Sequence, residues 1–242
     1  MKKLLFLLIV LLVSGAIQAQ GGKVKTDTRS FLAFHAGPSF PVGDFYSTDI
    51  INHGDITLAN REAGFAKVGV NANLTYSYKV LENLGLAASV FYNNNNLNQG
   101  AIEREFGLTE AGLNVLEIDH WKWYGLTVGP MLMHNISPKM TVDLRVMGGI
   151  ANANSPKIAI QGEEWAKEDW AVAPVFQGGL DLRFGFGNNM FIFTNVDYLY
   201  MKPKFNIESF DINDAGELVT VTEPIKQKMS VVNLTGGFGI RF

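Results

Sequence analysis

Residues 231–242 have the sequence VVNLTGGFGIRF, in which large apolar side chains alternate with polar side chains or glycine over most of its length. One face of this segment carries Val232, Leu234, Phe238, Ile240 and Phe242, and the other carries Asn233, Thr235 and Arg241. A period of two residues is typical of a β-strand whose two faces meet different surroundings. The segment therefore predicts a strand with one apolar and one polar face.

The same period recurs along the chain and predicts eight strands, at 29–42, 65–80, 85–97, 119–134, 140–151, 169–184, 190–203 and 227–242. Short connections at 81–84, 135–139 and 185–189 alternate with long ones at 43–64, 98–118, 152–168 and 204–226. Outer-membrane barrels combine an even strand number with short periplasmic turns and longer extracellular loops. We therefore predict an all-β fold: an eight-stranded antiparallel up-and-down transmembrane β-barrel, with short periplasmic turns and long extracellular loops.

The N-terminal residues predict export. Lys2 and Lys3 precede the apolar run Leu4–Val13, and small residues up to Ala19 follow it, which is the layout of a secretory signal peptide. A run of about ten residues is too short to span a bilayer, which needs about 20. We expect a signal peptide at 1–19, a periplasmic leader at 20–28 and a barrel at 29–242. The expected location is the outer membrane of a Gram-negative bacterium.

Composition excludes several classes of protein. The 242 residues contain no cysteine, which excludes a disulfide framework, thiol catalysis and Cys-ligated metals. The formal net charge of −3 provides no basic surface for nucleic acid. The four histidines lie on separate predicted elements without metal-site spacing. We predict no cofactor, no metal site and no nucleic-acid partner.

Alternation alone does not say which face of the barrel points outward. A soluble lipocalin-like barrel would turn its apolar face inward around a ligand. Two features favour the membrane barrel: aromatic residues at both ends of the apolar face, as in outer-membrane barrels, and charges of both signs on the polar face. The predicted polar network of the lumen consists of Lys67, Lys79, Asp143, Arg145, Asp181, Arg183, Asp197 and Arg241, with His35 on the same face.

An eight-stranded barrel is just wide enough for side chains to fill its interior. Buried charges are costly unless they are paired, so we expect the network to form an ion-paired plug. A narrow, gated pore is the alternative.

Two segments carry a family resemblance. Residues 31–45, FLAFHAGPSFPVGDF, combine an alternating strand with Gly-Pro and Pro-x-Gly-Asp-Phe, and the chain ends in GGFGIRF. Together they resemble the PorT-like outer-membrane β-barrel family of the Bacteroidota. The resemblance implies an outer-membrane barrel of small OmpA-like architecture and no catalytic residues. The C-terminal segment is similar to the signal that the barrel-assembly machinery recognises, which implies that role for Phe238, Ile240 and Phe242.

The four long connections are acidic, with net charges of −3, −3, −1 and −3 in chain order. Ordinary solvation of surface loops explains this, and a sharper hypothesis is that the acidic surface attracts cations or a basic partner. We predict a non-enzymatic barrel that contacts outer-membrane lipid and presents these loops for surface interaction, envelope integrity or small-solute passage.

An outer-membrane enzyme acting on lipid A or peptides is the alternative from another class. His134 and Ser137 are close in sequence, but they border a predicted tight turn and have no orienting acid nearby. We therefore predict no catalytic residues.

Overall fold

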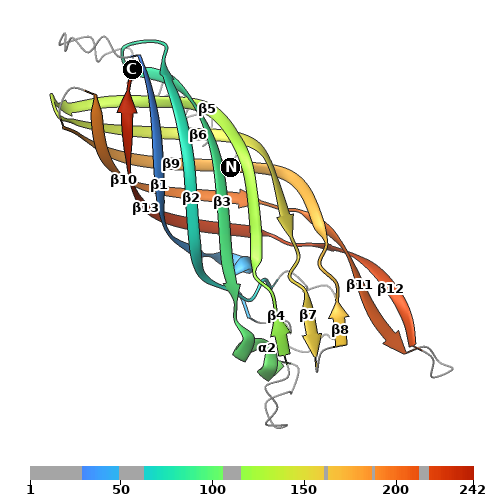
Figure 1. Ribbon diagram of the computed structural model, residues 1–242. Helices are drawn as coiled ribbons and strands as arrows, with labels where there is room; N and C mark the ends of the chain where they lie inside the picture. Colours follow the sequence, from blue (N-terminus) through green and yellow to red (C-terminus); the bar gives the residue numbers. More distant parts are fainter. Residues whose placement is uncertain (1–28, 49–62, 106–115, 161–162, 187–188, 213–217) are drawn as a thin grey trace.

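The computed structural model describes residues 29–48, 63–105, 116–160, 163–186, 189–212 and 218–242. The predicted signal peptide and leader lie outside these ranges. Within them, eight antiparallel strands close a barrel in the order β1-β13-β10-β9-β6-β5-β3-β2 (Figure 1). Their bounds are β1 Ser30–Pro41, β2 Ala66–Lys79, β3 Leu84–Leu97, β5 Trp121–Ser137, β6 Met140–Asn154, β9 Trp170–Phe186, β10 Met190–Met201 and β13 Met229–Arg241. The predicted fold class is confirmed.

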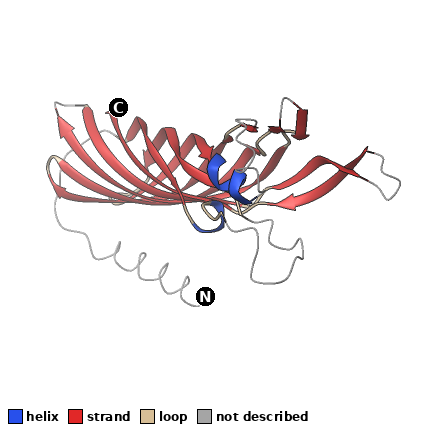
Figure 2. Ribbon diagram, turned by 90° about the horizontal axis from the view of Figure 1, so that it is seen from below, coloured by secondary structure: helices blue, strands red, loops and turns tan. Residues whose placement is uncertain are grey.

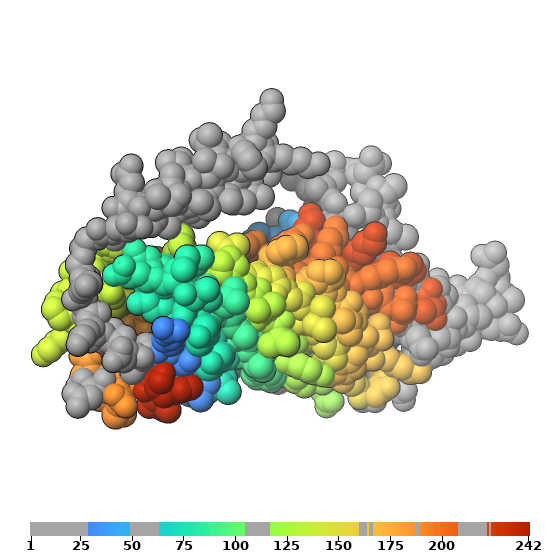
Figure 3. Space-filling view, turned by 90° about the horizontal axis from the view of Figure 1, so that it is seen from above, coloured from blue at the N-terminus to red at the C-terminus, as the bar shows by residue number. Residues whose placement is uncertain are grey.

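The first and last strands of the barrel close it. β1 pairs with β13 from Phe31 opposite Arg241 to Pro41 opposite Val231. The blue and red ends of the described chain accordingly lie side by side on the surface (Figure 3). Closure satisfies the backbone groups that an open edge would leave unpaired in lipid.

The barrel has two different ends. At one end, which we call the turn end, short connections join β2 to β3, β5 to β6 and β9 to β10. At the other, which we call the loop end, long connections join the remaining strands. β5 runs to Ser137 and β6 begins at Met140, so this turn is shorter than the predicted 135–139.

Along the middle of all eight strands the buried residues are the odd-numbered ones. The even-numbered side chains form an exposed apolar surface that includes Leu74, Val90, Leu126, Leu180, Val196 and Leu234. Such a continuous apolar exterior suits the hydrocarbon core of a bilayer and not water. This exterior is opposite to that of the soluble lipocalin-like barrel, which is therefore excluded.

Aromatic side chains ring both ends of this apolar exterior. The Tyr76 and Phe242 rings lie 6.3 Å apart at the turn end, and Tyr124 lies 6.0 Å from Trp170 at the loop end. The Tyr124 hydroxyl also accepts a hydrogen bond from the Asn152 amide at 3.0 Å. Amphipathic aromatic girdles of this kind occupy the two membrane–water interfaces.

The long connections contain short strands in addition to the eight strands of the barrel. Five short strands form a second sheet in the order β12-β11-β8-β7-β4, within the described ranges. Their bounds are β4 Leu116–Ile118, β7 Ile158–Ile160, β8 Glu163–Ala166, β11 Lys204–Ile212 and β12 Leu218–Lys226. The β11–β12 hairpin extends beyond the barrel (Figures 1 and 2). Pairing between neighbouring loops supplies backbone hydrogen bonds that each loop would otherwise lack.

Two short helical segments lie at the loop end within the described residues: the 3-10 turn η1, Gly43–Phe45, and the helix α2, Gln99–Glu105. No helix in the described parts of the chain is long and apolar enough to cross a membrane.

Candidate functional site

Four charged side chains form the centre of the lumen. Asp143 on β6 and Asp181 on β9 lie directly opposite each other in the strand register. Two like charges in this position repel each other, and each is compensated by an arginine from the opposite strand. Arg145 Nη2 lies 2.9 Å from Asp181 Oδ1, and Arg183 Nη2 donates to Asp143 Oδ1 at 2.8 Å. The pairs therefore cross the two strands diagonally.

Neutral side chains complete this charged centre. The Arg145 guanidinium also donates to the Thr75 hydroxyl at 3.4 Å, and the Asn195 amide donates to the carboxylate of Asp181. Buried charges need such additional hydrogen bonds because the lumen offers them little water.

Asp197 has no arginine partner of its own among the described ion pairs. Its carboxylate accepts hydrogen bonds from the Gln177 amide at 3.2 Å and the Asn233 amide at 3.3 Å. Gln177 in turn accepts a hydrogen bond from Thr127 at 2.7 Å. Amide donors thus hold this carboxylate in place of a salt bridge.

The charged side chains and their hydrogen-bonded neighbours form a polar belt around the lumen. His35 on β1 is part of this belt. Its ring nitrogen Nδ1 lies 2.7 Å from the Thr235 hydroxyl, and the Thr235 hydroxyl donates to Asn195 at 3.2 Å. His35, Thr235 and Asn195 are all buried. The belt therefore continues around the barrel from β9 through β10 and β13 to β1.

The other side of the belt is built from asparagine and hydroxyl side chains on β2 and β3. The Asn71 amide donates to Asn93 at 3.0 Å, and the Thr75 and Ser89 hydroxyls lie 3.0 Å apart. The run Asn93–Asn96 contributes two of these buried side chains, Asn93 and Asn95, because alternate residues of β3 point inward. Asn93 and Asn95 of this run are therefore part of the lumen.

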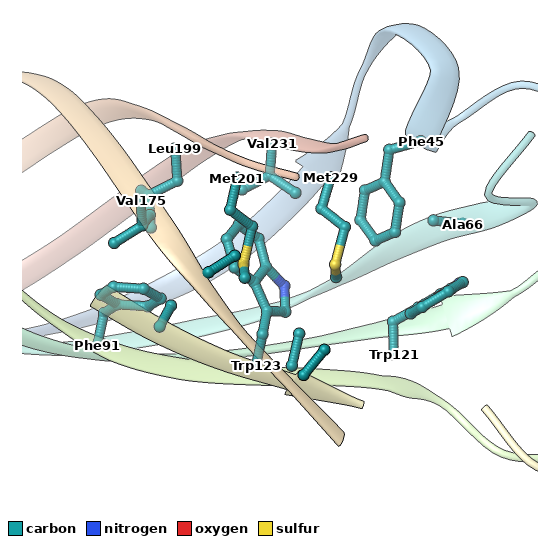
Figure 4. Packing of buried hydrophobic residues seen from close by; sticks show 14 of the residues in the cluster. Phe45, Ala66, Phe91, Trp121, Trp123, Val175, Leu199, Met201, Met229 and Val231 are labelled. Carbon is teal, nitrogen blue, oxygen red and sulfur yellow. The ribbon is translucent and has the colours of Figure 1, made fainter. Parts of the chain in front are cut away.

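Apolar side chains fill the lumen above the belt, at the loop end. One buried cluster contains Phe45, Phe91, Trp121, Trp123, Val175, Leu199, Met201, Phe205, Met229 and Val231, together with small alanines. Figure 4 shows the side chains of Trp123, Met201 and Met229 converging from three different strands. Tightly packed hydrophobic groups thus lie between the charged centre of the lumen and the loops, with Asn93 and Asn95 of β3 at the same level as Trp123 and Trp121.

A second apolar cluster lies below the belt, at the turn end. It contains Phe31, Ala33, Ala87, Met131, Met147, Phe191 and Phe193. The Arg183 guanidinium lies 4.5 Å from the centre of the Phe31 ring, so the ion pair of Arg183 with Asp143 packs directly against this cluster. Side chains therefore fill the lumen in three layers: apolar, polar and apolar.

The structure separates the predicted network residues into two groups. Asp143, Arg145, Asp181, Arg183 and Asp197 are buried together in the lumen. The other three residues lie elsewhere.

The prediction of Lys67 as a lumen residue is wrong, because its side chain is exposed. A register shift between Ala66 and Gly69 interrupts the alternation there, so an odd number no longer means an inward side chain. Lys79 and Arg241 are half-buried at the turn end, away from the central belt.

The predicted charged network did not include many members of the belt, although Asn233 and Thr235 were already placed on the polar face of the last strand. Thr75, Thr127, Gln177, Asn195, Asn233 and Thr235 are buried and hydrogen-bonded in it. Their signal was present in the sequence, because all six are odd-numbered, as are the buried charged residues of the lumen. A search for neutral polar side chains at the odd-numbered positions of the strands finds them.

The three residues of the predicted assembly signal are all exposed on the outer surface of β13 and its end. Phe238, Ile240 and Phe242 belong to the apolar exterior. Their recognition by the assembly machinery stays a prediction.

Several acidic side chains of the loops have local partners. Asp44 forms an ion pair with Lys228 at 2.8 Å, and Asp169 accepts a hydrogen bond from the backbone of Asn206 at 2.7 Å. A hydrogen bond from Lys157 lowers the pKa of the Glu164 carboxyl and raises the pKa of the Lys157 ammonium. Part of the loop acidity therefore stabilises the loop structure itself.

The histidine and serine considered for catalysis lie at the turn end. His134 and Ser137 are both exposed on β5. The Ser137 hydroxyl accepts a hydrogen bond from the backbone of Lys139 at 3.4 Å, as expected of a turn residue. His120 is exposed near the loop end, and His53 lies outside the described residues.

Neither a protein-family model nor a curated protein sequence matches this chain. Solved structures share its fold. A major outer membrane protein from Thermus thermophilus is 10% identical, with 88% of this chain and 99% of that chain covered and a TM-score of 0.52. Ail, the attachment invasion locus protein of Yersinia pestis, is 14% identical, with 90% and 100% covered and a TM-score of 0.48.

At these identities the likeness shows the fold alone. That fold is the small eight-stranded outer-membrane β-barrel, and the apolar exterior described above is the surface it requires. The chain is thus an outer-membrane barrel of the Gram-negative type. The finer resemblance to the PorT-like family stays a prediction.

Proposed function

We propose that the protein is a non-enzymatic barrel that anchors an acidic loop surface outside the cell, where it attracts cations or a basic partner. One observation carries this proposal: the lumen is filled by side chains while three of the long connections join into a sheet beyond the barrel. The regular structure that a barrel of this kind can offer to a partner then lies in the loops.

The filled lumen argues against solute passage as the main role. Trp123, Met201 and Met229 are fully buried at the loop end, and Arg145 is fully buried in the belt. Opening a path would break the ion pair between Arg145 and Asp181, which leaves charges uncompensated in a space of low dielectric constant. The interior is therefore better suited to hold the barrel rigid than to conduct.

The acidic character of the loops supplies the recognition chemistry. A surface of one sign raises the local concentration of counter-ions and speeds the approach of oppositely charged partners. The locally paired residues, such as Asp44 and Glu164, hold the loops in shape, and Glu117 remains exposed on β4. A basic peptide or a cation is the partner class that this charge favours.

The test is binding of decalysine and of Ca²⁺ to the refolded protein, measured between 0.1 and 1 M salt. The screening length falls from about 10 Å to about 3 Å over this range, so attraction by the loops must weaken. A variant with Glu103→Gln, Glu105→Gln, Glu208→Gln and Asp211→Asn should bind both probes more weakly at 0.1 M salt. Glu82→Gln, at the turn end, is the control and should bind like the parent protein.

Binding that does not respond to salt, or that survives the four substitutions, contradicts the proposal. The loop charges would then serve solvation alone.

A further inference from the structure

A pocket opens at the turn end of the barrel. Its volume is about 70 Å³, and the ends of β1, β2, β5, β6, β9 and β13 surround it. A water molecule needs roughly 10–15 Å³ by this measure, so the pocket holds about five water-sized groups. A tetrahedral oxyanion such as phosphate has five heavy atoms and is of this size.

The charge of the pocket is mainly positive. Arg29, Lys79, Arg183 and Arg241 line it, against one acid in the lining, Glu82. This surface belongs to the opposite end of the barrel from the acidic loops, and it is independent of the function proposed for them.

Two of the arginines lie beside the same aromatic ring. The guanidinium of Arg183 lies 5.4 Å from the centre of the Phe191 ring, and that of Arg241 lies 5.3 Å from the same centre. Phe191 is fully buried, so it cannot turn away. Stacking on an aromatic ring fixes the direction of a guanidinium without using its hydrogen-bond donors.

The two arginines differ in their charge compensation. Arg183 is paired with the buried carboxylate of Asp143. No ion pair joins Arg241 to a carboxylate in the part of the chain that the structure describes. Of the two guanidinium groups only that of Arg183 is ion-paired with a carboxylate among the described residues, and the charge of Arg241 therefore favours an anion.

We propose that this pocket binds a tetrahedral oxyanion, such as a phosphate group, through Arg241 with Arg183 beside it. The planar fork of a guanidinium donates two parallel hydrogen bonds to such an anion. Lys79 and Arg29 add positive charge at the rim.

Two sources can supply this chemistry at the turn end. One is free phosphate in the surrounding water. The other is the headgroup of an anionic lipid, because the Tyr76 and Phe242 rings mark the membrane interface at this end.

The test is titration of inorganic phosphate into the refolded full-length protein in uncharged maltoside micelles, followed by calorimetry. We expect saturable binding to the parent protein and a loss of at least tenfold in affinity for Arg241→Gln, with a smaller loss for Arg241→Lys. Lys67→Gln removes one exposed positive charge near the loop end and should change affinity by less than twofold. Far-UV circular dichroism confirms that each variant is folded before titration.

The same titration in nanodiscs of phosphatidylglycerol distinguishes the two sources. Loss of phosphate binding there, with binding retained in micelles, identifies the lipid headgroup as the occupant, and equal binding in both identifies a soluble anion. The proposal is overturned if phosphate shows no saturable binding up to about 10 mM, a concentration that corresponds to a binding free energy near −3 kcal/mol. It is equally overturned if folded Arg241→Gln binds phosphate as tightly as the parent.

Discussion

Arg145 on β6 and Asp181 on β9 form an ion pair of 2.9 Å in the middle of the barrel, where their side chains are only 2% and 6% exposed. The pair connects two strands that are neighbours in the barrel, and it lies at the centre of the polar belt. Because the charges are almost completely removed from water, each one depends on the other. The consequences for stability can be measured directly.

Removing one partner of this pair should be costly. Asp181→Ala leaves the Arg145 charge buried without its ion-pair partner, and we expect the free energy of unfolding to fall by about 3–5 kcal/mol. The double variant Arg145→Met with Asp181→Leu removes both charges and should be considerably more stable than the single variant. Urea titration of the protein in lipid vesicles gives these values.

A matched control for this measurement is Lys157→Gln, because it breaks an ion pair that is well exposed on the loops. Its effect should be much smaller than that of Asp181→Ala, because an exposed ion pair contributes little to stability. A single variant at Asp181 that is no less stable than the double variant would show that Arg145 does not need its partner.

A charged substitution on the outer face should destabilise the barrel more near the middle of the membrane than at its edge. Leu234 and Phe242 both lie on the exterior, 50% and 58% exposed, and they are eight positions apart in the same segment. We expect Leu234→Arg to destabilise the barrel by about 2–4 kcal/mol and Phe242→Arg by about 0–1 kcal/mol. The measurement is refolding into bilayers under increasing urea, and equal effects at the two sites would mean that the depth assignment is wrong.

The filled lumen predicts a protein without a steady conductance. Trp123 and Tyr124 are neighbours on β5, but Trp123 is buried in the lumen and Tyr124 is exposed on the outside. Trp123→Ala should therefore increase ion conductance in planar bilayers, whereas Tyr124→Ala should leave it unchanged. Stable single-channel currents from the parent protein would favour the alternative of a narrow pore.

The loop pair between Lys157 and Glu164 should respond to pH in a defined window. The pKa of Glu164 is lowered in the folded protein, so its contribution is present above the ordinary value of about 4.3 and is lost as the pH falls through the lowered value. The pKa of Lys157 is raised, so its contribution is present below about 10.4 and is lost as the pH rises through the raised value. The pair is therefore fully formed at neutral pH.

NMR titration of the Glu164 side-chain carboxyl carbon checks this window. Its midpoint should lie below that of an isolated glutamate and rise toward it in Lys157→Gln. An unchanged midpoint in that variant would show that Lys157 does not act on Glu164.

The period of two in the sequence determined the strands and the face on which most side chains lie. It placed Asp143, Arg145 and Asp181 inside and Leu234 and Phe238 outside, as the burial of these residues shows. The alternation of short and long connections determined the order of the strands around the barrel. Both are local properties, because a side chain's face depends only on its position along its own strand.

Tertiary structure determined which side chains pair across strands and where the alternation is interrupted, because the period of two predicts neither. The face of a residue does not give its height relative to other strands, so only the register shows that Arg145 pairs with Asp181 and Arg183 with Asp143. The bulge at Ala66–Gly69 moved Lys67 out of the lumen, because one irregular step changes the face of the residues beyond it.

The apolar layers and the loop sheet were likewise decided at the tertiary level. Trp123 and Met201 are odd-numbered, as the lumen residues are. Their apolar character alone, however, indicates the lipid face. Barrel closure brought them together from different strands and made them fill one space. The sheet of β4, β7, β8, β11 and β12 formed because closure also gathered the long connections at one end, where their backbones could pair with one another.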